Sequence, residues 1–328
     1  TVSSCSGSTI GVVCVVLAAS LGWVGCSDAG EGTLLEINGT ELFVQRMGQG
    51  EPILVLHGGP VLEHGYLLPH LAPLAEDHEL IFFDQRLCGR SAGIVDPSSV
   101  RLDTFVEDIE GIREALGLGR IHLLAHSWGG LLGMQYALAH GENLRSLILL
   151  SPMSASERLW QEEEAAQAAK ISLADRMARI DIMGSEAFEE ERPEAIRELL
   201  LLTFQWQFHD PAKIEGLELF VPEDYGDRSR QFGLLRDDLA GYDFHEELRS
   251  VTAPALILYG ADEPGAEIGG RALQEKLPNS EFVVMEDAGH FPFIEQPEPF
   301  LEIVRAFLGS LGDGLSMEES ASRLQVGL

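Results

Sequence analysis

The sequence predicts an α/β protein in which a mostly parallel sheet is flanked by helices and interrupted by an inserted helical cap. Two observations lead to this fold class. Short, continuous apolar runs alternate with stretches of helical periodicity, which is typical of strands buried on both faces of a parallel sheet. The alternation stops between residues 153 and 248 and then resumes, which indicates an insertion rather than the end of the sheet.

The strand signals occur in a regular order along the chain. Asn38-Gly39 is a strong hairpin signal and joins Leu34–Ile37 to Leu42–Gln45. Six further apolar runs predict buried strands: Ile53–Leu56, Leu80–Phe83, Ile121–Ala125, Leu147–Leu150, Ala255–Tyr259 and Phe282–Met285. Helical patterns such as Leu102–Leu116 and Trp128–His140 lie between them, so right-handed crossovers connect parallel strands.

The stretch from 153 to 248 is helical in period and rich in Glu, Ala, Arg and Leu. An insertion at the carboxyl ends of sheet strands covers the crevice where ligands bind. We favour a lid over a separate helical domain because the sheet resumes directly at Ala255. The predicted divisions are therefore a first core part (33–152), the cap (153–248), a second core part (249–308) and a C-terminal tail (309–328).

Composition excludes some classes of partner. The chain has 328 residues, is 45% hydrophobic and carries a formal charge of −31. Nucleic acids need a basic surface, so they are excluded as a partner, and an anionic membrane surface is disfavoured electrostatically.

The first 25 residues are expected to lie outside the fold. Residues 10–25 are uncharged and apolar but short for a membrane-spanning helix, which fits a signal peptide. The run ends at Val24-Gly25-Cys26 and is followed by a flexible linker (26–32), as in a bacterial lipoprotein cleavage site. We therefore expect an exported protein, anchored in a membrane through a lipidated Cys26 on the periplasmic or cell-surface side, with an uncleaved anchor as the alternative. Cys88 would remain alone, so no internal disulfide is expected.

The strongest chemical signal is Ala125-His126-Ser127-Trp128-Gly129, which follows a strand and precedes a helix. A nucleophile elbow needs small residues two positions before and after its Ser, because the turn is strained and crowded. Ser127 would stand at a helix N-terminus, where amide dipoles favour developing negative charge. A plain serine N-cap is the alternative, but the strand and helix on either side favour a nucleophile.

An acid and a base are expected in the order Ser, acid, His. Asp262 follows the strand Ala255–Tyr259, and His290 follows the strand Phe282–Met285. Both therefore fall at the same sheet edge as Ser127, which predicts a catalytic triad of Ser127, Asp262 and His290. Glu263 is the rival acid.

Two further loops belong to this edge. His57-Gly58-Gly59-Pro60 follows a strand, and the Gly59 and Trp128 N–H groups are predicted to form an oxyanion hole. His57 and His126 are expected to be structural, and the Asp84–Ser91 loop is expected to be a hydrogen-bonded support under the site. The other histidines show no metal-binding spacing, and no cofactor is implied.

Together these residues resemble the α/β-hydrolase superfamily and, more narrowly, the proline iminopeptidase branch of serine peptidases. The matching motifs are His57–Pro60, Asp84–Ser91 and Ala125–Gly129, together with the late acid Asp262 and His290. Val61, Leu87 and Ala125 stand where that branch carries glycine, and the first two are expected near the mouth of the pocket.

The resemblance also implies that cap carboxylates bind the free α-amine of a substrate. No motif singles out one of the candidates, which are Glu162, Glu163, Glu164, Glu189, Glu190, Glu191, Asp210, Glu215 and Glu218. Trp206 and Phe208 are expected to pack in the core of the cap, with a pocket wall as their alternative role.

The expected activity is that of a serine hydrolase resembling proline iminopeptidase, which releases an N-terminal residue from small peptides through an acyl-enzyme. An esterase or lactonase acting on small carboxylic esters is the alternative, because acyl transfer to Ser127 is common to both. A binding protein on a hydrolase fold would lack a member of the triad, and candidates for all three are present.

Overall fold

The computed structural model describes residues 32–59 and 61–312. The predictions for the signal peptide, for Cys26 and for most of the linker and the tail lie outside this range and stay predictions. Pro60 also lies outside it. The tail predicted from residue 309 begins within the last turn of helix α11 (Pro297–Gly312). No helix among the described residues combines the length and apolarity that crossing a bilayer requires.

A single eight-stranded sheet forms the centre of the molecule, in the order β1-β2-β4-β3-β5-β6-β7-β8. Strand β2 runs antiparallel to β1 and β4, and the other neighbours pair in parallel. Each predicted apolar run lies in a strand. The strands are β1 (Thr33–Ile37), β2 (Thr40–Gly48), β3 (Glu51–Leu56), β4 (His78–Phe83), β5 (Ile121–His126), β6 (Leu144–Leu150), β7 (Ala255–Gly260) and β8 (Ser280–Met285).

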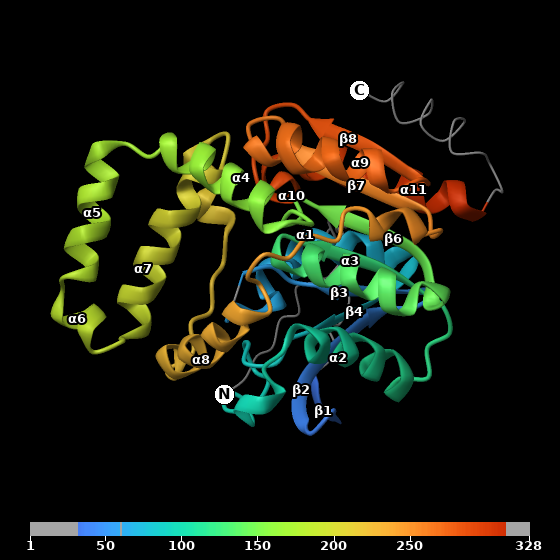
Figure 1. Ribbon diagram of the computed structural model, residues 1–328, viewed down its shortest axis with the longest axis horizontal. Coiled ribbons are helices and arrows are strands. Elements are labelled where there is room, and N and C mark those ends of the chain that lie inside the picture. Colours follow the sequence, from blue (N-terminus) through green and yellow to red (C-terminus); the bar gives the residue numbers. More distant parts are fainter. Residues whose placement is uncertain (1–31, 60, 313–328) are drawn as a thin grey trace, which may run out of the picture.

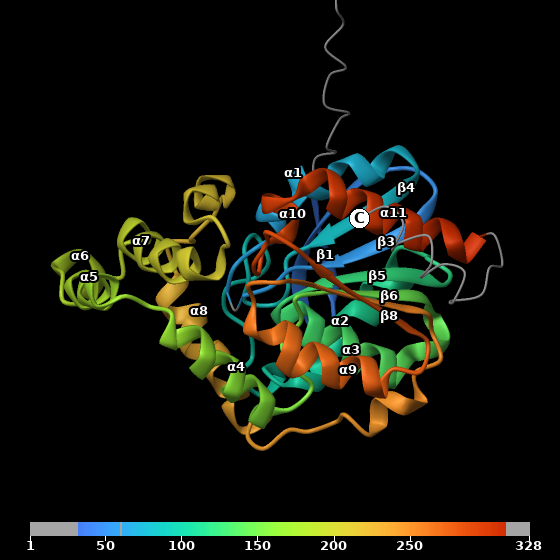
Figure 2. The ribbon, with the colours of Figure 1, turned by 90° about the horizontal axis from the view of Figure 1, so that it is seen from above.

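Helices cover both faces of the sheet, which explains why its central strands are apolar throughout. In β3, Leu54 and Leu56 join one apolar cluster, whereas Ile53 and Val55 join the cluster on the opposite face. Figure 2 shows the two helical layers with the strands between them. One layer consists of α2 (Leu102–Ala115), α3 (Trp128–His140) and α9 (Arg271–Lys276), and the other of α1 (Leu68–Leu71), α10 (Pro292–Glu295) and α11.

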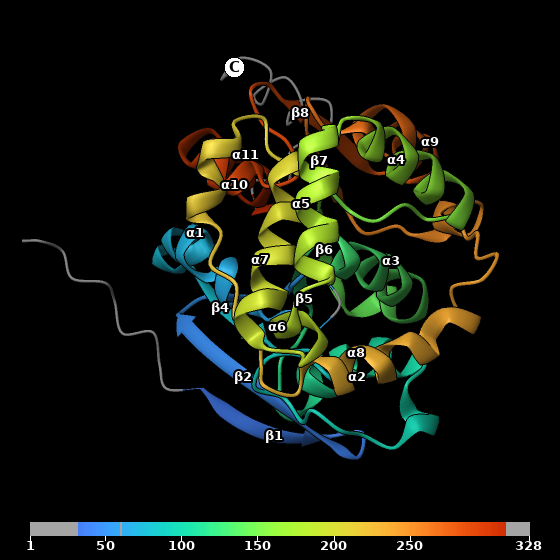
Figure 3. The same ribbon diagram turned by 90° about the vertical axis from the view of Figure 1, so that its left-hand side faces the viewer.

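The cap is inserted between β6 and β7 and stands beside the sheet (Figures 1 and 3). Its α-helices are α4 (Glu157–Ala169), α5 (Leu173–Met183), α6 (Glu186–Glu189), α7 (Pro193–Phe204) and α8 (Tyr225–Phe232). The side chains of Ser156, Ser172 and Ser185 accept backbone N–H groups at the starts of the first three. These N-caps satisfy donors that a helix otherwise leaves unpaired.

The two ends of the cap meet in a short antiparallel bridge between Ser156 and Asp243. The Glu157 N–H donates to Tyr242 O at 2.9 Å, and the Phe244 N–H donates to Ala155 O at 3.1 Å. The chain therefore leaves and re-enters the core at adjacent points, so the insertion leaves the pairing of β6 with β7 intact.

A buried ion pair ties the loop after β4 to α2. Arg86 donates from Nε and Nη2 to the two carboxylate oxygens of Asp108, both at 2.7 Å. Arg86 is fully buried and Asp108 nearly so, and burial raises the pKa of Asp108 although Arg86 opposes this shift. Such a pair is sensitive to the loss of one partner, since the remaining charge is left without compensation.

Arg86→Met should lower the free energy of unfolding by about 3–5 kcal/mol, because it leaves the Asp108 carboxylate buried without its cation. Urea unfolding followed by circular dichroism measures this loss. Arg101→Met is the matched control, since Arg101 is half-exposed in its ion pairs and should cost about 0–1 kcal/mol. Equal losses in the two variants would contradict the assignment.

Candidate active site

Ser127 occupies a strained turn between β5 and α3. Its φ of 55° and ψ of −119° lie outside the regions that non-glycine residues favour. Three hydrogen bonds hold the turn: Ser127 N–H to Leu150 O at 3.0 Å, Gly130 N–H to Ser127 O at 2.8 Å and Met153 N–H to Ser127 O at 2.9 Å. This is the geometry of a nucleophile elbow, and it lifts the hydroxyl out of the strand.

Glycines allow the elbow and the turn after β3 to pack backbone against backbone. A Cβ on Gly58 would lie 2.7 Å from the Ser127 Cβ, and one on Gly129 would lie 2.7 Å from both Leu56 O and His57 O. Gly59 and Trp128 both line the cavity that contains Ser127, and among the described residues neither N–H has a protein acceptor. The oxyanion hole stays a prediction that this placement favours.

The acid that holds His290 is Glu263. His290 Nδ1 lies 2.6 Å from Glu263 Oε1, and both side chains are largely buried. Ser127, Glu263 and His290 all line the same cavity. The arrangement matches an acid that fixes the imidazole tautomer and leaves Nε2 for the nucleophile.

The prediction that Asp262 performs this role is wrong. Its carboxylate is half-exposed and bonds Nδ1 of His209, a residue of the cap. The Asp262 N–H donates to Ala288 O, and the Glu263 N–H donates back to Gly260 O in the turn after β7. This turn directs the second acidic side chain, not the first, toward His290. The hydrogen bond to Asp262 raises the pKa of His209.

His126 connects the turn after β3, which contains Gly58 and Gly59 (the oxyanion turn), to the backbone of His290. The Gly58 N–H donates to Tyr66 Oη at 2.7 Å, and that oxygen lies 2.7 Å from His126 Nδ1. His126 Nε2 lies 3.0 Å from His290 O, so Nε2 carries the proton and Nδ1 accepts from Tyr66. Burial holds the pKa of His126 well below its ordinary value, which keeps this neutral tautomer.

His57 has an equally structural role. The Gln85 N–H donates to His57 Nε2 at 3.1 Å, and the Gln85 side-chain amide donates to His57 O at 2.7 Å. Gln85 also accepts from the Trp128 indole N–H at 2.9 Å. Burial lowers the pKa of His57 to about 4, so it accepts as a neutral ring. The Asp84–Ser91 loop thus supports both turns, as the sequence predicts.

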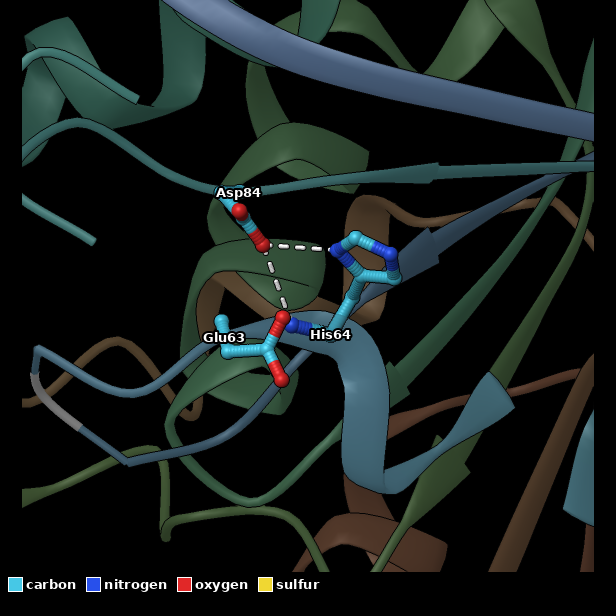
Figure 4. A group of neighbouring side chains, drawn as sticks. All are labelled: Glu63, His64 and Asp84. Carbon is cyan, nitrogen blue, oxygen red and sulfur yellow. Dashed lines mark hydrogen bonds and ion pairs between the residues drawn. The ribbon is translucent and has the colours of Figure 1, made fainter. Parts of the chain in front are cut away.

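Glu63, His64 and Asp84 form a buried group that could in principle hold a cation (Figure 4). However, Asp84 Oδ1 lies 2.7 Å from His64 Nδ1 and also accepts the His64 N–H, while Oδ2 accepts the Arg90 N–H. His64 Nε2 bonds Gln45 Oε1 at 3.1 Å. Because both ring nitrogens of His64 already have partners, we interpret the group as a structural hydrogen-bond network that holds the Asp84–Ser91 loop.

The active-site cavity has a volume of about 320 Å³ and lies between the core and the cap, which supplies part of its lining. It is lined mainly by apolar side chains, among them Trp160, Phe204, Leu217, Leu219, Phe232 and Phe291. Of the predicted carboxylate candidates, Glu163 and Glu164 reach it. Phe208 packs in the core and stacks on Phe291 at 4.7 Å between ring centroids, and Trp206 is not among the lining residues.

Comparison with known proteins fits this geometry. The model of the alpha/beta hydrolase family matches residues 53–303. The chain belongs to the alpha/beta hydrolase family. It is 30% identical over 303 residues to a proline iminopeptidase of Heyndrickxia coagulans, an alignment that covers 84% of this chain and 98% of the relative.

Two solved structures have a similar fold. A proline iminopeptidase-related protein of Thermus thermophilus is 27% identical, with a TM-score of 0.65 and coverage of 87% of this chain and 99% of that one. The proline iminopeptidase of Mycobacterium smegmatis shares the fold, with a TM-score of 0.64 at 24% identity over 86% of this chain and 98% of its own.

Within this alpha/beta hydrolase, Val61 and Leu87 adopt backbone conformations that glycine favours. Their φ values are 63° and 66°, which are uncommon for any residue with a side chain and rare for a β-branched one. Both side chains are buried, and neither lines the cavity, so the expectation that they lie at its mouth is wrong. Neither side chain therefore contributes directly to the lining of the pocket.

Glu263→Gln should lower kcat by about 10³- to 10⁴-fold for any substrate, because the amide cannot hold and stabilise the imidazolium of His290. Asp262→Asn is the matched control at the adjacent position, and its kcat should stay within a few-fold of wild type. Turnover of a p-nitrophenyl ester, normalised to folded protein, measures both. The reverse ranking would show that Asp262 is the catalytic acid.

Proposed function

We propose that this alpha/beta hydrolase is a serine aminopeptidase of the proline iminopeptidase kind, which releases an N-terminal residue, proline included, from small peptides. The observation that supports this proposal most is a cavity lined by Ser127, by the His290–Glu263 pair and by two cap carboxylates, Glu163 and Glu164. The similarity to proline iminopeptidases over most of the chain supports the same activity.

The charge of the cavity suits a cationic substrate. Three carboxylates line it, those of Glu163, Glu164 and Glu263, and none of its described lining residues is Lys or Arg. Three buried oxygens of the lining residues have no protein partner among the described residues: Glu263 Oε2, Gln207 Oε1 and Ser151 Oγ. An ammonium group brings two or three donors and a positive charge, and it satisfies both features.

Glu163 is the candidate for the residue that binds the α-amine. It lies on α4 of the cap and accepts from Ser154 Oγ at 2.6 Å. Burial raises the pKa of Glu163 to about 8, so at pH 7 the free carboxyl group is mostly protonated. Binding of an ammonium favours the ionised form, because the cation replaces the lost hydration. Substrate binding therefore releases a proton from Glu163.

The proposed chemistry uses Ser127 as the nucleophile, His290 as the base and Glu263 as the acid that orients the base. His290 Nε2 takes the Ser127 proton as Oγ bonds the substrate carbonyl carbon, and the Gly59 and Trp128 N–H groups receive the developing oxyanion. His290 then gives the proton to the leaving amine as the C–N bond breaks. A water molecule, activated by the same imidazole, releases the acid and regenerates Ser127.

An esterase or lactonase is the second candidate, and the apolar wall of the cavity favours it. Aromatic and aliphatic side chains of the cap and of the α10 segment would hold an acyl chain without any need for an amine. The two candidates share the acyl-enzyme step and differ in whether a free α-amine contributes to binding.

Matched chromogenic panels separate these functions. We expect wild-type protein to hydrolyse prolyl and other aminoacyl arylamides, and to lose this activity when the amine is acetylated. Ser127→Ala should abolish turnover of every substrate, because no other group forms the acyl-enzyme. Turnover of short p-nitrophenyl esters without any arylamide turnover would establish the esterase instead.

Glu163→Gln should raise KM for aminoacyl arylamides by about 10-fold or more, corresponding to a lost charge-assisted contact, with little change for neutral esters. In the wild type, KM for arylamides should fall as pH rises toward about 8, because ionised Glu163 becomes available, and should rise again above it, because the substrate α-amine loses its charge there. The variant should lose the fall in KM below pH 8. Glu162→Gln, one position earlier and exposed on α4, is the control and should behave as wild type. A rise in KM that is equal for esters and arylamides would contradict the assignment.

A further inference from the structure

A second buried carboxylate lies next to the catalytic histidine but outside the cavity. Glu295 ends α10 and is 1% exposed. It is not among the cavity's lining residues, so it does not contact the reacting atoms. Buried carboxylates are rare unless their oxygens are paired, so the partners of Glu295 indicate its role.

The two carboxylate oxygens of Glu295 connect the cap to the loop between β8 and α10, which contains His290 (the histidine loop). Oε2 accepts the N–H of Gly289, the residue directly before His290, at 2.6 Å. Oε1 accepts the N–H of Asp210, in the returning segment of the cap, at 3.0 Å. From the same part of the cap, Lys213 Nζ donates to the backbone oxygen of Glu295.

The cap segment 207–210 also contacts the histidine loop directly. The His290 N–H donates to Gln207 O at 2.7 Å. A Cβ on Gly289 would collide with Gln207 O, so the two backbones are in contact. On its other side, the His290 carbonyl accepts from His126 Nε2 at 3.0 Å. The backbone of His290 is therefore fixed by one bond from the core, one from the cap and, through Gly289, one from Glu295.

We propose that Glu295 is a positioning residue, which sets the orientation of His290 through Gly289 and links that orientation to the position of cap segment 207–210. The inference rests on the proposed function, because it assigns the base of that reaction to His290. A shift of segment 207–210 away from the core breaks contacts with Gly289, His290 and Glu295 together. Cap opening thus removes the base from its working position as well as exposing the cavity.

Glu295→Gln tests the link with minimal change in shape. The amide keeps one accepting oxygen, but its NH₂ group faces the other backbone N–H, so one of the two bonds is lost. We expect kcat to fall about 10- to 100-fold, the range that a small misplacement of a catalytic group produces, with KM within about 2-fold of wild type. The fall should be equal for aminoacyl arylamides and p-nitrophenyl esters. Glu302→Gln, exposed on α11, is the control and should leave kcat unchanged.

The rates must be expressed per functional site, because a loss of folded protein would also lower turnover. Titration of Ser127 with a fluorophosphonate gives the number of sites, and thermal unfolding reports stability. Lys213→Met should lower kcat per site in the same direction but by less, since it removes only one contact from the cap side. Unchanged kcat per site in Glu295→Gln, with a lowered Tm, would reduce Glu295 to a purely structural role and overturn the proposal.

Hydrogen exchange tests the link without any substrate. In Glu295→Gln, the amides of segments 207–210 and 287–291 should exchange faster together, while those of α3 stay at the wild-type rate. Unchanged exchange in either segment would overturn the proposed coupling. If the wild type turned over no substrate in either panel, the proposed function would fail, whereas the exchange result would still decide whether Glu295 joins the cap to the histidine loop.

Discussion

The close packing of two turns, backbone against backbone, is the constraint on which the site depends. Ser127 holds a conformation that costs on the order of 1–3 kcal/mol, and only a rigid surrounding can maintain it. The turn after β3 supplies part of this surrounding, because Gly58 and the carbonyls of Leu56 and His57 lie against Ser127 and Gly129. The approach is possible only without side chains at Gly58 and Gly129. The same approach brings Gly59 and Trp128 to one cavity.

Below these turns lies a layer of buried polar side chains whose protonation states are set by burial. His57 and His126 are neutral at physiological pH because the low-dielectric interior disfavours their charged forms. Each ring therefore both donates and accepts, and so connects groups that two cationic rings could not. Tyr66 and Gln85 complete the connections to the oxyanion turn and to Trp128. Because the ring nitrogens of His57 and His126 are occupied in this way, the structural role predicted for both residues fits their hydrogen bonds.

Much of the fold could be predicted from the sequence because buried parallel strands leave a direct signal. The runs from Ile53 to Leu56 and from Ala255 to Tyr259 are apolar at every position, and each lies in a strand with helices on both faces. The elbow was equally recognisable, since its steric demand fixes residue types two positions either side of Ser127. The choice between Asp262 and Glu263 could not be predicted, because both follow the same strand and only the hydrogen bonds of the turn decide which side chain faces His290.

Glu163 could not be singled out among the cap carboxylates, and Glu295 was missed altogether. The roles that we propose for them depend on burial against distant segments, and nothing in the local sequence separates them from exposed glutamates such as Glu162.

The antiparallel bridge between Ser156 and Asp243 has a consequence for engineering and for the divergence of such enzymes. Because the insertion begins and ends at neighbouring, hydrogen-bonded residues, two adjacent backbone segments connect it to the core (the neck). A foreign lid of different length could be grafted at this neck without changing the register of β6 and β7. Such a graft would need to supply a backbone carbonyl that accepts the His290 N–H. In the native insertion, the carbonyl of Gln207 accepts this hydrogen bond. The bond from the His290 N–H to a carbonyl of the lid is thus a criterion by which chimaeras could be screened before any substrate is known.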